Sequence, residues 1–394
     1  MLSLSCLSHQ TEPEKTSDRM RFWQTQKKGT NMNLTKVRPE WFEAAYEKGF
    51  QFIRFNVSWF LTDNKDFLIG DTDNFTHIDP KDLKILIEAL DAAETNHQKI
   101  ILTMFELPGC RDGNADKTQD YRIWHNESYQ QQAMQFWKEL ASAAKDHPAI
   151  VAYDLLNEPH PEREYGLEEP DKAFIDWLDK IKGTAADLNL FNKRMVASIR
   201  EVDPYTPIML EGYFYSSPEG LPYLEVIDDP AILYSFHNPG PWQFTTYNAN
   251  KGRYRYPDNM PGYWNDPGTP WTINNLVELL EPVKRFISDN NIDADRIVAS
   301  EVLCDRRIEG CAGYLKDLFT LYDEQKWHWS FYAFREDMAW TGLDYEIGTS
   351  PDPAGYWGKI ENGADYNTLK NDLRHDNPIW SVIQNEFLNQ QSVK

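Results

Sequence analysis

The sequence has little of several features that mark common protein classes. It contains 4 cysteines in 394 residues, without a Cys-x-x-Cys pair, and its 9 histidines show no His-x-His or His-Glu-x-x-His spacing, so no catalytic metal is expected. No stretch approaches the ~20 apolar residues that span a membrane. Basic residues are also few, 40 against 62 acidic ones, which gives a net charge of −22. Because an acidic surface repels phosphates and anionic lipids, we expect neither a nucleic acid partner nor membrane insertion.

The N-terminus and the cysteines give little further evidence about targeting or disulfide bonds. Residues 1–20 begin with a mildly apolar stretch and continue as polar sequence, without the basic start and longer apolar segment of a secretory signal. We expect a tail there, disordered or the remnant of a targeting segment, and one domain over residues 21–394. Cys304 and Cys311 are close enough to bridge a short loop, although the sequence does not show that they do.

Short β-rich runs alternate with amphipathic segments along the chain. Several of the runs are almost continuously apolar, which is typical of parallel strands buried on both faces. We predict strands at 29–34, 52–57, 99–105, 150–156, 207–212, 231–237, 296–301 and 329–334. Helices are predicted between them, among others over 79–93, 131–148, 272–287 and 312–325. The fold class is therefore α/β, a single-domain (β/α)8 barrel; the rival doubly wound sheet lacks a Gly-x-Gly-x-x-Gly after its first strand.

Three connections, at 106–128, 238–270 and 335–376, are long and lack a clear periodic element. Each follows a predicted strand, on the face where barrels keep their active sites, so we interpret them as walls of a cleft. Aromatics make up 14 % of the chain and can form either a large core or flat faces for sugars. The tryptophans in these connections are candidates for either role: Trp124, Trp242, Trp264 and Trp340.

Two glutamates stand at the ends of predicted strands. Glu158 follows the fourth strand, in "AIVAYDLLNEPHPE", and Glu301 ends the seventh. In a barrel these ends meet at one mouth, where two carboxylates can cleave a glycosidic bond without a cofactor. Taken singly, each glutamate could equally cap a helix or pair with an arginine.

Five motifs occur in barrel order. They are "KGTNMNL" with "WFEAAYEKGFQFIRFNVSW", "YDLLNEPH", "YSFHNPGPWQFT", "IVASEVLCDRR" and "WHWSFYAFRED". Over about Trp23 to Gly348 the chain resembles glycoside hydrolase family 5, the cellulase family of retaining (β/α)8 enzymes.

The resemblance implies a role for seven side chains. Glu158 is expected as the proton donor and acid/base, and Glu301 as the nucleophile, held ionised by a nearby arginine. Asn157 is expected to bind the sugar 2-hydroxyl. The expected substrate-binding residues are Arg54, Asn157, His237, Trp329 and Tyr332.

The sequence departs from the family pattern at four places. Phe105 stands where a histidine is usual, Ser300 and Leu303 replace the glycines around the nucleophile, and Pro239 replaces a tyrosine. Tyr332 takes the position of the tryptophan under the reacting sugar. These changes affect substrate preference more than reaction type.

We therefore predict a hydrolase that retains configuration at a β-glycosidic bond, in first place an endo-β-1,4-glucanase. A β-mannanase, a β-1,3-glucanase, a glycolipid glycosidase and an inactive carbohydrate-binding barrel remain alternatives. The expected partner is a β-linked oligo- or polysaccharide bound by a monomer. The family implies a secreted or periplasmic protein, although the N-terminus shows no clear signal peptide.

Overall fold

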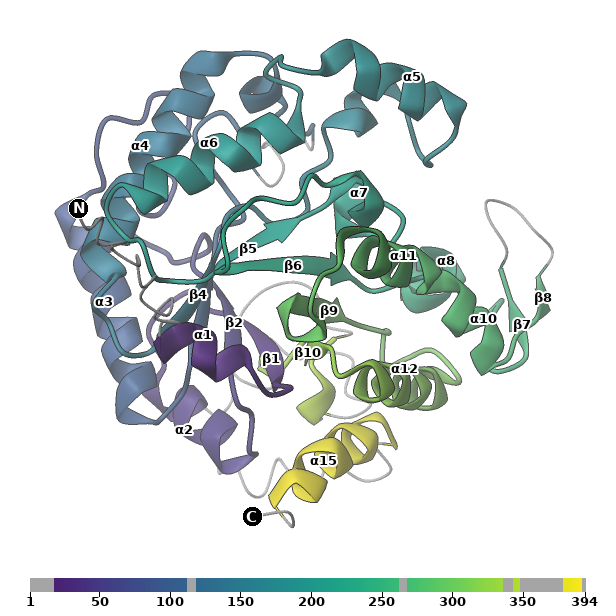
Figure 1. Cartoon of the computed structure of the whole chain (residues 1–394). Helices are drawn as coiled ribbons and strands as arrows, with labels where there is room; N and C mark the ends of the chain where they lie inside the picture. The colour runs from purple at the N-terminus through teal and green to yellow at the C-terminus, as the bar shows by residue number, and fades with distance from the viewer. Residues whose placement is uncertain (1–17, 112–117, 262–267, 336–342, 348–377, 392–394) are drawn as a thin grey trace, which may run out of the picture.

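The structure is a computed structural model that describes residues 18–111, 118–261, 268–335, 343–347 and 378–391. Eight parallel strands close into a barrel in the order β1-β10-β9-β6-β5-β4-β3-β2, with helices around it (Figure 1). The predicted (β/α)8 barrel is confirmed, and each of the eight predicted strands is present. Their bounds are β1 (Lys28–Asn33), β2 (Ile53–Asn56), β3 (Ile100–Thr103), β4 (Ile150–Asp154), β5 (Ile208–Glu211), β6 (Ile232–His237), β9 (Ile297–Val302) and β10 (His328–Phe331).

The helices fill the connections between the strands. They are α1 (Asp18–Trp23), α2 (Pro39–Glu47), α3 (Pro80–Thr95), α4 (Glu127–Ala144), α5 (Lys172–Ile181), α6 (Leu188–Arg200), α7 (Tyr213–Ser216), α8 (Trp242–Thr245), α9 (Tyr247–Asn250), α10 (Ile273–Leu279), α11 (Glu281–Asn290), α12 (Cys311–Gln325) and α15 (Pro378–Gln391). Single 3-10 turns lie at η1 (Arg122–Trp124), η2 (Pro161–Tyr165), η3 (Leu221–Tyr223), η4 (Ala294–Arg296) and η5 (Tyr345–Ile347).

Capping side chains and prolines decide where several helices begin. Asp79 accepts a hydrogen bond from the backbone of Lys81 and Pro80 occupies the first turn of α3, as the sequence predicts. The helix predicted over 272–287 is instead two helices, α10 and α11, because Pro282 cannot continue the backbone hydrogen bonding of the first and begins the second.

The base of the barrel is closed by α1. Trp23 is fully buried against Phe52, Ile101 and Val298, and its indole donates to the carbonyl of Val151 at 3.1 Å. Residues 18–20 of the expected tail belong to this helix. Residues 1–17, the rest of the expected tail, lie outside the described residues.

Alternation along each strand sends every second side chain into the barrel. Phe52, Ala152 and Met209 form the lower layer with Trp23. Two residues further along their strands, Arg54, Asp154 and Glu211 form a layer that is polar and fully buried. From the base upward, the side chains inside the barrel thus change from apolar to charged toward the carboxyl ends of the strands.

The long connections contain more structure than their sequence indicates. The connection at 238–270 holds α8, α9 and a hairpin of β7 (Asn259–Met260) with β8 (Thr269–Pro270). The connection at 106–128 contains η1 and ends in the first residues of α4. Within 335–376, the structure describes only 335 and 343–347.

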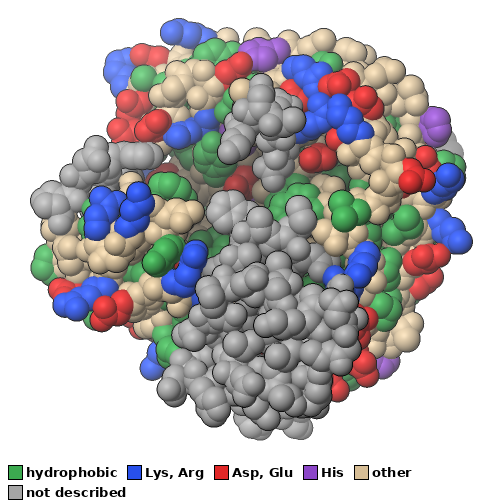
Figure 2. Space-filling model, turned by 180° about the vertical axis from the view of Figure 1, so that it is seen from behind, with side chains coloured by type: hydrophobic (Ala, Val, Ile, Leu, Met, Phe, Trp, Pro, Cys, Tyr) green, Lys and Arg blue, Asp and Glu red, His purple; other side chains and the backbone are tan. Residues whose placement is uncertain are grey.

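Acidic and basic side chains are interspersed around the edge of the face seen in Figure 2. Among the described residues, no helix has the length and apolar composition to cross a membrane.

Candidate active site

Glu158 and Glu301 meet at the mouth of the barrel. One oxygen of each carboxylate and one ring nitrogen of His237 all lie within 4.8 Å of one another. Glu301 is in β9, where a β-bulge opposite His237 shifts the register and turns its side chain toward the mouth. Glu158 follows β4 with a left-handed backbone, φ 49°, and is the more exposed of the two, with 34 % of its side chain accessible against 8 % for Glu301.

Arg54 lies beneath the two carboxylates and holds the site together. Its guanidinium donates to Asp154 at 2.8 Å, to Glu211 at 2.9 Å and to Glu301, while its own side chain is 1 % exposed. It also donates to the Asn157 oxygen at 2.8 Å, so this hydrogen bond leaves the donor side of the Asn157 amide available.

His237 ends β6 and bridges two carboxylates. Its Nδ1 lies 2.8 Å from Glu158 Oε1, and its Nε2 lies 3.1 Å from Glu211 Oε1. Burial disfavours a charged ring, but Glu211 and Glu301, with the hydrogen bonds to Glu158 and Glu211, raise the pKa of His237 well above its ordinary 6.5.

Two buried carboxyl groups of this site, Asp154 and Glu211, carry no role in the sequence interpretation. Strand alternation could have identified them, because each lies on a predicted strand at the inward-facing position that corresponds to Arg54 on its strand. Burial and the charge of Glu211 raise the pKa of Asp154 against the opposing effect of Arg54. Burial also acts to raise the pKa of Glu211, but His237 and Arg54 outweigh it and lower that pKa.

The charges around Glu301 oppose one another. Burial raises the pKa of its carboxyl, the cations His237 and Arg54 act to lower it, and Glu158 and Glu211 raise it further, with a net increase. Arg54 thus favours the ionised form, as expected, but does not by itself outweigh desolvation.

The sequence also matches a known protein family. The sequence model described as Cellulase (glycosyl hydrolase family 5) matches residues 19–336. The chain belongs to glycosyl hydrolase family 5.

Relatives of this family 5 chain are distant. Endoglucanase C of Acetivibrio thermocellus is 25% identical over 213 residues, which are 53% of this chain and 52% of the relative. Endoglucanase A of Ruminococcus albus is 24% identical over 275 residues, 66% of this chain and 64% of the relative. The chain therefore spans about half to two thirds of the length of these relatives. The endoglucanase Cel5A of Thermotoga maritima has the same fold, with a TM-score of 0.61, 14% identity, and coverage of 90% of this chain and 98% of that one.

Trp329, one of the residues expected to bind substrate, does not lie at the mouth of the barrel. Trp329 is fully buried outside the barrel wall, stacked on Phe319 of α12 at 4.2 Å between ring centroids and packed against Phe387 of α15. The expectation that it binds substrate is wrong. Tyr332 follows β10 at the rim, and its hydroxyl accepts a hydrogen bond from Asn33 at 2.5 Å. It remains a candidate for substrate contact.

The other departures from the family pattern also have a place in the structure. Phe105 packs edge-on against Trp59, and the Arg54 guanidinium lies 5.7 Å from its ring centre, so an apolar ring adjoins the site where a histidine is usual. Trp124 is buried against Phe191 and anchors its connection. Trp242 is 61% exposed and is free to meet a ligand, whereas Trp264 and Trp340 lie outside the described residues.

The triad of Glu158, His237 and Glu301 has a spacing that could also hold a metal ion. The ring nitrogens of His237, however, are engaged with Glu158 and Glu211, and Arg54 contacts Glu301. A metal would need an unprotonated histidine beside a buried guanidinium, so we assign no metal to this set.

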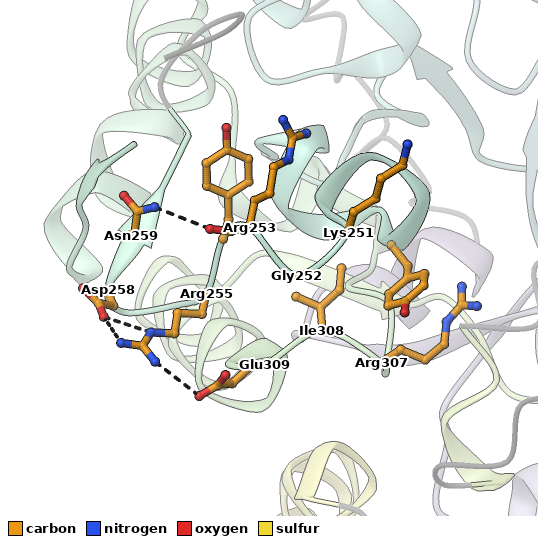
Figure 3. Close-up of a pocket in the computed structure, with 11 residues that line it drawn as sticks. Lys251, Gly252, Arg253, Arg255, Asp258, Asn259, Arg307, Ile308 and Glu309 are labelled. Carbon is orange, nitrogen blue, oxygen red and sulfur yellow. Dashed lines mark hydrogen bonds and ion pairs between the residues drawn. The ribbon is translucent and has the colours of Figure 1, made fainter. Parts of the chain in front are cut away.

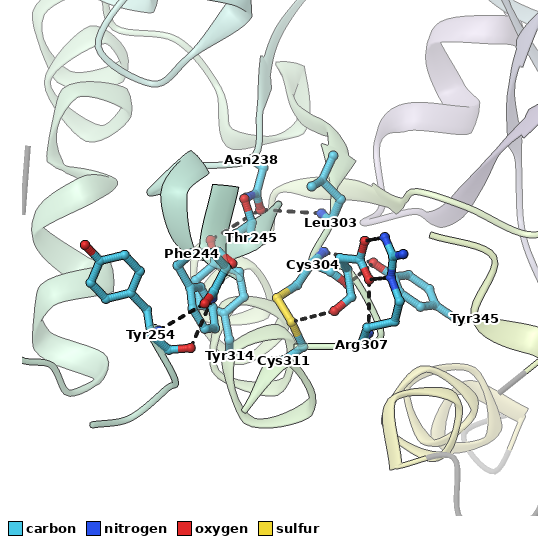
Figure 4. The surroundings of a disulfide bond; sticks show 12 residues. Asn238, Phe244, Thr245, Tyr254, Leu303, Cys304, Arg307, Cys311, Tyr314 and Tyr345 are labelled. Carbon is cyan, nitrogen blue, oxygen red and sulfur yellow. Dashed lines mark hydrogen bonds and ion pairs between the residues drawn. A yellow bond between two sulfur atoms is a disulfide. The ribbon is translucent and has the colours of Figure 1, made fainter. Parts of the chain in front are cut away.

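A disulfide joins Cys304 to Cys311, a possibility that the sequence left open. It spans the turn between β9 and α12 (Figure 4), and Cys304 exchanges backbone hydrogen bonds with the Tyr345 hydroxyl at 2.9 and 3.0 Å. In the same turn Leu303 donates to Asn238, the neighbour of His237, at 3.5 Å. The bridge therefore supports the connection that directly follows the Glu301 strand.

A second concavity of about 570 Å³ lies between the connections after β6 and β9 (Figure 3). Its cations do not converge: Arg255 pairs with Asp258 and Glu309, and Arg307 pairs with Asp305. We assign it no ligand.

Proposed function

We propose that the protein is a retaining β-glycosidase that acts as an endo-β-1,4-glucanase. The observation that carries the proposal is the approach of Glu158 to Glu301, with oxygens within 4.8 Å. Retaining glycosidases hold their carboxyl groups about 5–5.5 Å apart, whereas inverting enzymes need about 6.5–9.5 Å to admit a water molecule. The spacing supports direct attack by one carboxylate on the sugar.

In the first step Glu301 forms a bond to the anomeric carbon while the bond to the leaving oxygen breaks. That oxygen takes the proton of Glu158. In the second step water attacks the anomeric carbon, its proton passes to Glu158, and Glu301 is released. Asn157 is placed to bind the 2-hydroxyl, where a hydrogen bond strengthens as positive charge develops on the ring.

The preference for β-1,4-glucan rests on the family and on relatives that are named endoglucanases. A β-mannanase is the second candidate, because the Thermotoga maritima Cel5A structure was also obtained with mannotriose. The disulfide supports a secreted or periplasmic location, since such bonds persist in oxidising compartments. Action as a monomer is part of the proposal.

The test is release of reducing ends from β-1,4-glucan, β-mannan and β-1,3-glucan, with proton NMR of the first product anomer. We expect hydrolysis of β-1,4-glucan with retention, and the loss of about 100-fold or more of the rate in Glu158→Ala and Glu301→Ala. Circular dichroism checks that each variant folds. Initial release of the α-anomer, or full activity in either variant, would refute the proposal.

A further inference from the structure

The carboxylate of Glu211 accepts four hydrogen bonds, although the proposed reaction assigns it no role. Its Oε1 accepts from Arg54 at 2.9 Å and from His237 at 3.1 Å. Its Oε2 accepts from the backbone of Glu158 at 2.6 Å and from the Ser216 hydroxyl at 2.6 Å. The side chain is 1% exposed, so it does not meet the substrate itself. It links the acid/base, the histidine and the arginine from below.

The contact with His237 determines the protonation of the ring. A neutral imidazole donates from one nitrogen only, but both nitrogens of His237 face carboxylate oxygens, those of Glu158 and Glu211. A third carboxylate, Glu301, lies 3.7 Å from Nδ1. The titratable groups around the ring are thus Glu158, Glu211 and Glu301, with Arg54 behind Glu211. Glu211 and Glu301 favour an imidazolium even while Glu158 holds the proton that it donates.

Two segments that donate hydrogen bonds to Glu211 have left-handed backbone angles. Phe214, Tyr215 and Ser216 have consecutive left-handed φ angles of 57°, 54° and 60°, which non-glycine residues rarely adopt. This turn brings the Ser216 hydroxyl onto Glu211. Glu158, also left-handed, has its N–H held by the same carboxylate. Strain of this kind persists where the surroundings fix it, and it gathers at functional sites.

We propose that Glu211 is a positioning residue that keeps His237 as an imidazolium against Glu158 and fixes the backbone of Glu158. The role rests on the proposed glycosidase function. When Glu158 gives its proton to the leaving oxygen, the adjoining cation stabilises the carboxylate that forms, and Glu211 balances the charge of that cation. His237 Nδ1 also lies 3.7 Å from Glu301 Oε2, so the same cation adjoins the expected nucleophile.

Glu211→Gln tests the role, because glutamine has nearly the same size without the charge. The first measurement is the ring protonation of His237 by NMR of labelled histidine, assigned by the signal that disappears in His237→Gln. In the unaltered protein we expect an imidazolium at pH 7, and in Glu211→Gln a pKa lower by about one unit or more. We expect kcat on aryl β-cellobiosides to fall about tenfold or more in Glu211→Gln, with a smaller change in KM. The fall in kcat should be largest for poor leaving groups, because their departure depends most on the proton from Glu158.

Glu162→Gln is the matched control. Glu162 is also buried and accepts from the same strained turn, at the backbone of Phe214 at 2.9 Å, but the structure gives it no contact with His237 among the described residues. Its substitution should leave the His237 titration unchanged. Glu211→Asp, which retains the charge, should restore the imidazolium and part of the rate.

A neutral His237 at pH 7 in the unaltered protein overturns the proposal, and this measurement needs no variant to fold. An unchanged His237 titration or an unchanged kcat in Glu211→Gln overturns it as well. If the unaltered protein hydrolyses no glycoside while the His237 titration shifts as expected, the proposed function fails and the link from Glu211 to the ring remains.

Discussion

At the scale of single residues, the charge of the site depends on Arg54. Its guanidinium contacts three carboxyl groups, those of Asp154, Glu211 and Glu301, in a place from which water is excluded. Each of these groups is unfavourable when buried and ionised without a partner. Arg54 thus balances the charge of the buried carboxyl groups from which the mouth is built.

Arg54→Met should therefore lower the free energy of unfolding by about 3–5 kcal/mol, as expected when one partner of a buried ion network is removed. The change is to be measured by urea denaturation at pH 7. Arg111→Met is the comparison: Arg111 also pairs with three carboxylates, Asp66, Asp71 and Asp73, of which two are about half exposed. We expect a loss there of about 1 kcal/mol per exposed pair or less. Equal losses in the two variants would contradict this account.

His328 gives a second prediction at this scale, on stability and pH. It is fully buried at the base of the barrel, accepts from the backbone of Lys27 at 2.9 Å and lies 2.9 Å from the Asp295 carbonyl. Burial lowers the pKa of His328 to about 4. Below the unfolded pKa of 6.5 the unfolded chain binds the proton more readily, so stability is complete above pH 6.5 and falls as the pH drops toward 4.

The expected loss is about 3 kcal/mol between pH 7 and pH 4, from about 2.5 units at 1.36 kcal/mol each. Urea denaturation at several pH values measures it. Other groups titrate in this range, so the comparison is with His328→Gln. Between pH 7 and pH 4 the free energy of unfolding of this variant should fall by about 3 kcal/mol less than that of the unaltered protein. Parallel curves for the two proteins would show that His328 does not titrate as described.

At the scale of elements, strand alternation explains both what the sequence predicts and where its interpretation went wrong. The eight strands could be predicted because short β-rich runs, several of them almost continuously apolar, alternate with amphipathic segments. Trp329 and Tyr332 were both assigned to the substrate, yet residues three apart on a strand point to opposite sides. Ser330, which donates to the carbonyl of Ser300 inside the barrel, shows which parity faces inward. Only Tyr332 has that parity.

Glu211 was missed for a related reason. It was read as the last part of a strand, and no motif marked it, although its inward position could be inferred by alternation. Its contacts could not be inferred, because they depend on the left-handed turn after β5 and on the left-handed backbone of Glu158. Neither feature is marked by glycine: Phe214, Tyr215 and Ser216 are residues that ordinarily avoid such angles.

The element that follows β9 yields a prediction about the disulfide. Cys304 and Cys311 close a short loop, for which the loop-entropy relation gives about 2.5 kcal/mol of stabilisation. Cys304→Ser with Cys311→Ser should lower the melting temperature by about 3 °C for a chain of this size. Scanning calorimetry measures the shift. Cys110→Ser, at the free and half-buried cysteine, is the control, and a reductant should reproduce the double variant.

At the scale of the whole molecule, charge and shape act together. The barrel brings the residues of the candidate site together from β2, β4, β5, β6 and β9, which are neighbours in the closed sheet (Figure 1). The site is therefore fixed by the closure of the sheet rather than by any one connection. Around it the chain carries a net charge of −22. A neutral polymer approaches such a surface without electrostatic opposition, whereas an anionic one is repelled over roughly the Debye length, about 10 Å at 0.1 M salt.

Salt should therefore separate two classes of substrate. For carboxymethyl β-1,4-glucan we expect KM to fall several-fold as sodium chloride rises from about 0.01 to about 0.5 M, because screening removes the repulsion. For a neutral hydroxyethyl β-1,4-glucan we expect KM to change by less than about twofold over the same range, since it carries no charge to be screened. Initial rates of reducing-end release measure both, and kcat on the neutral polymer checks that salt leaves the reaction intact. A KM for the anionic polymer that rises with salt would mean that individual cations, such as Lys251 and Arg253 after β6, attract it and that the net charge does not govern its approach.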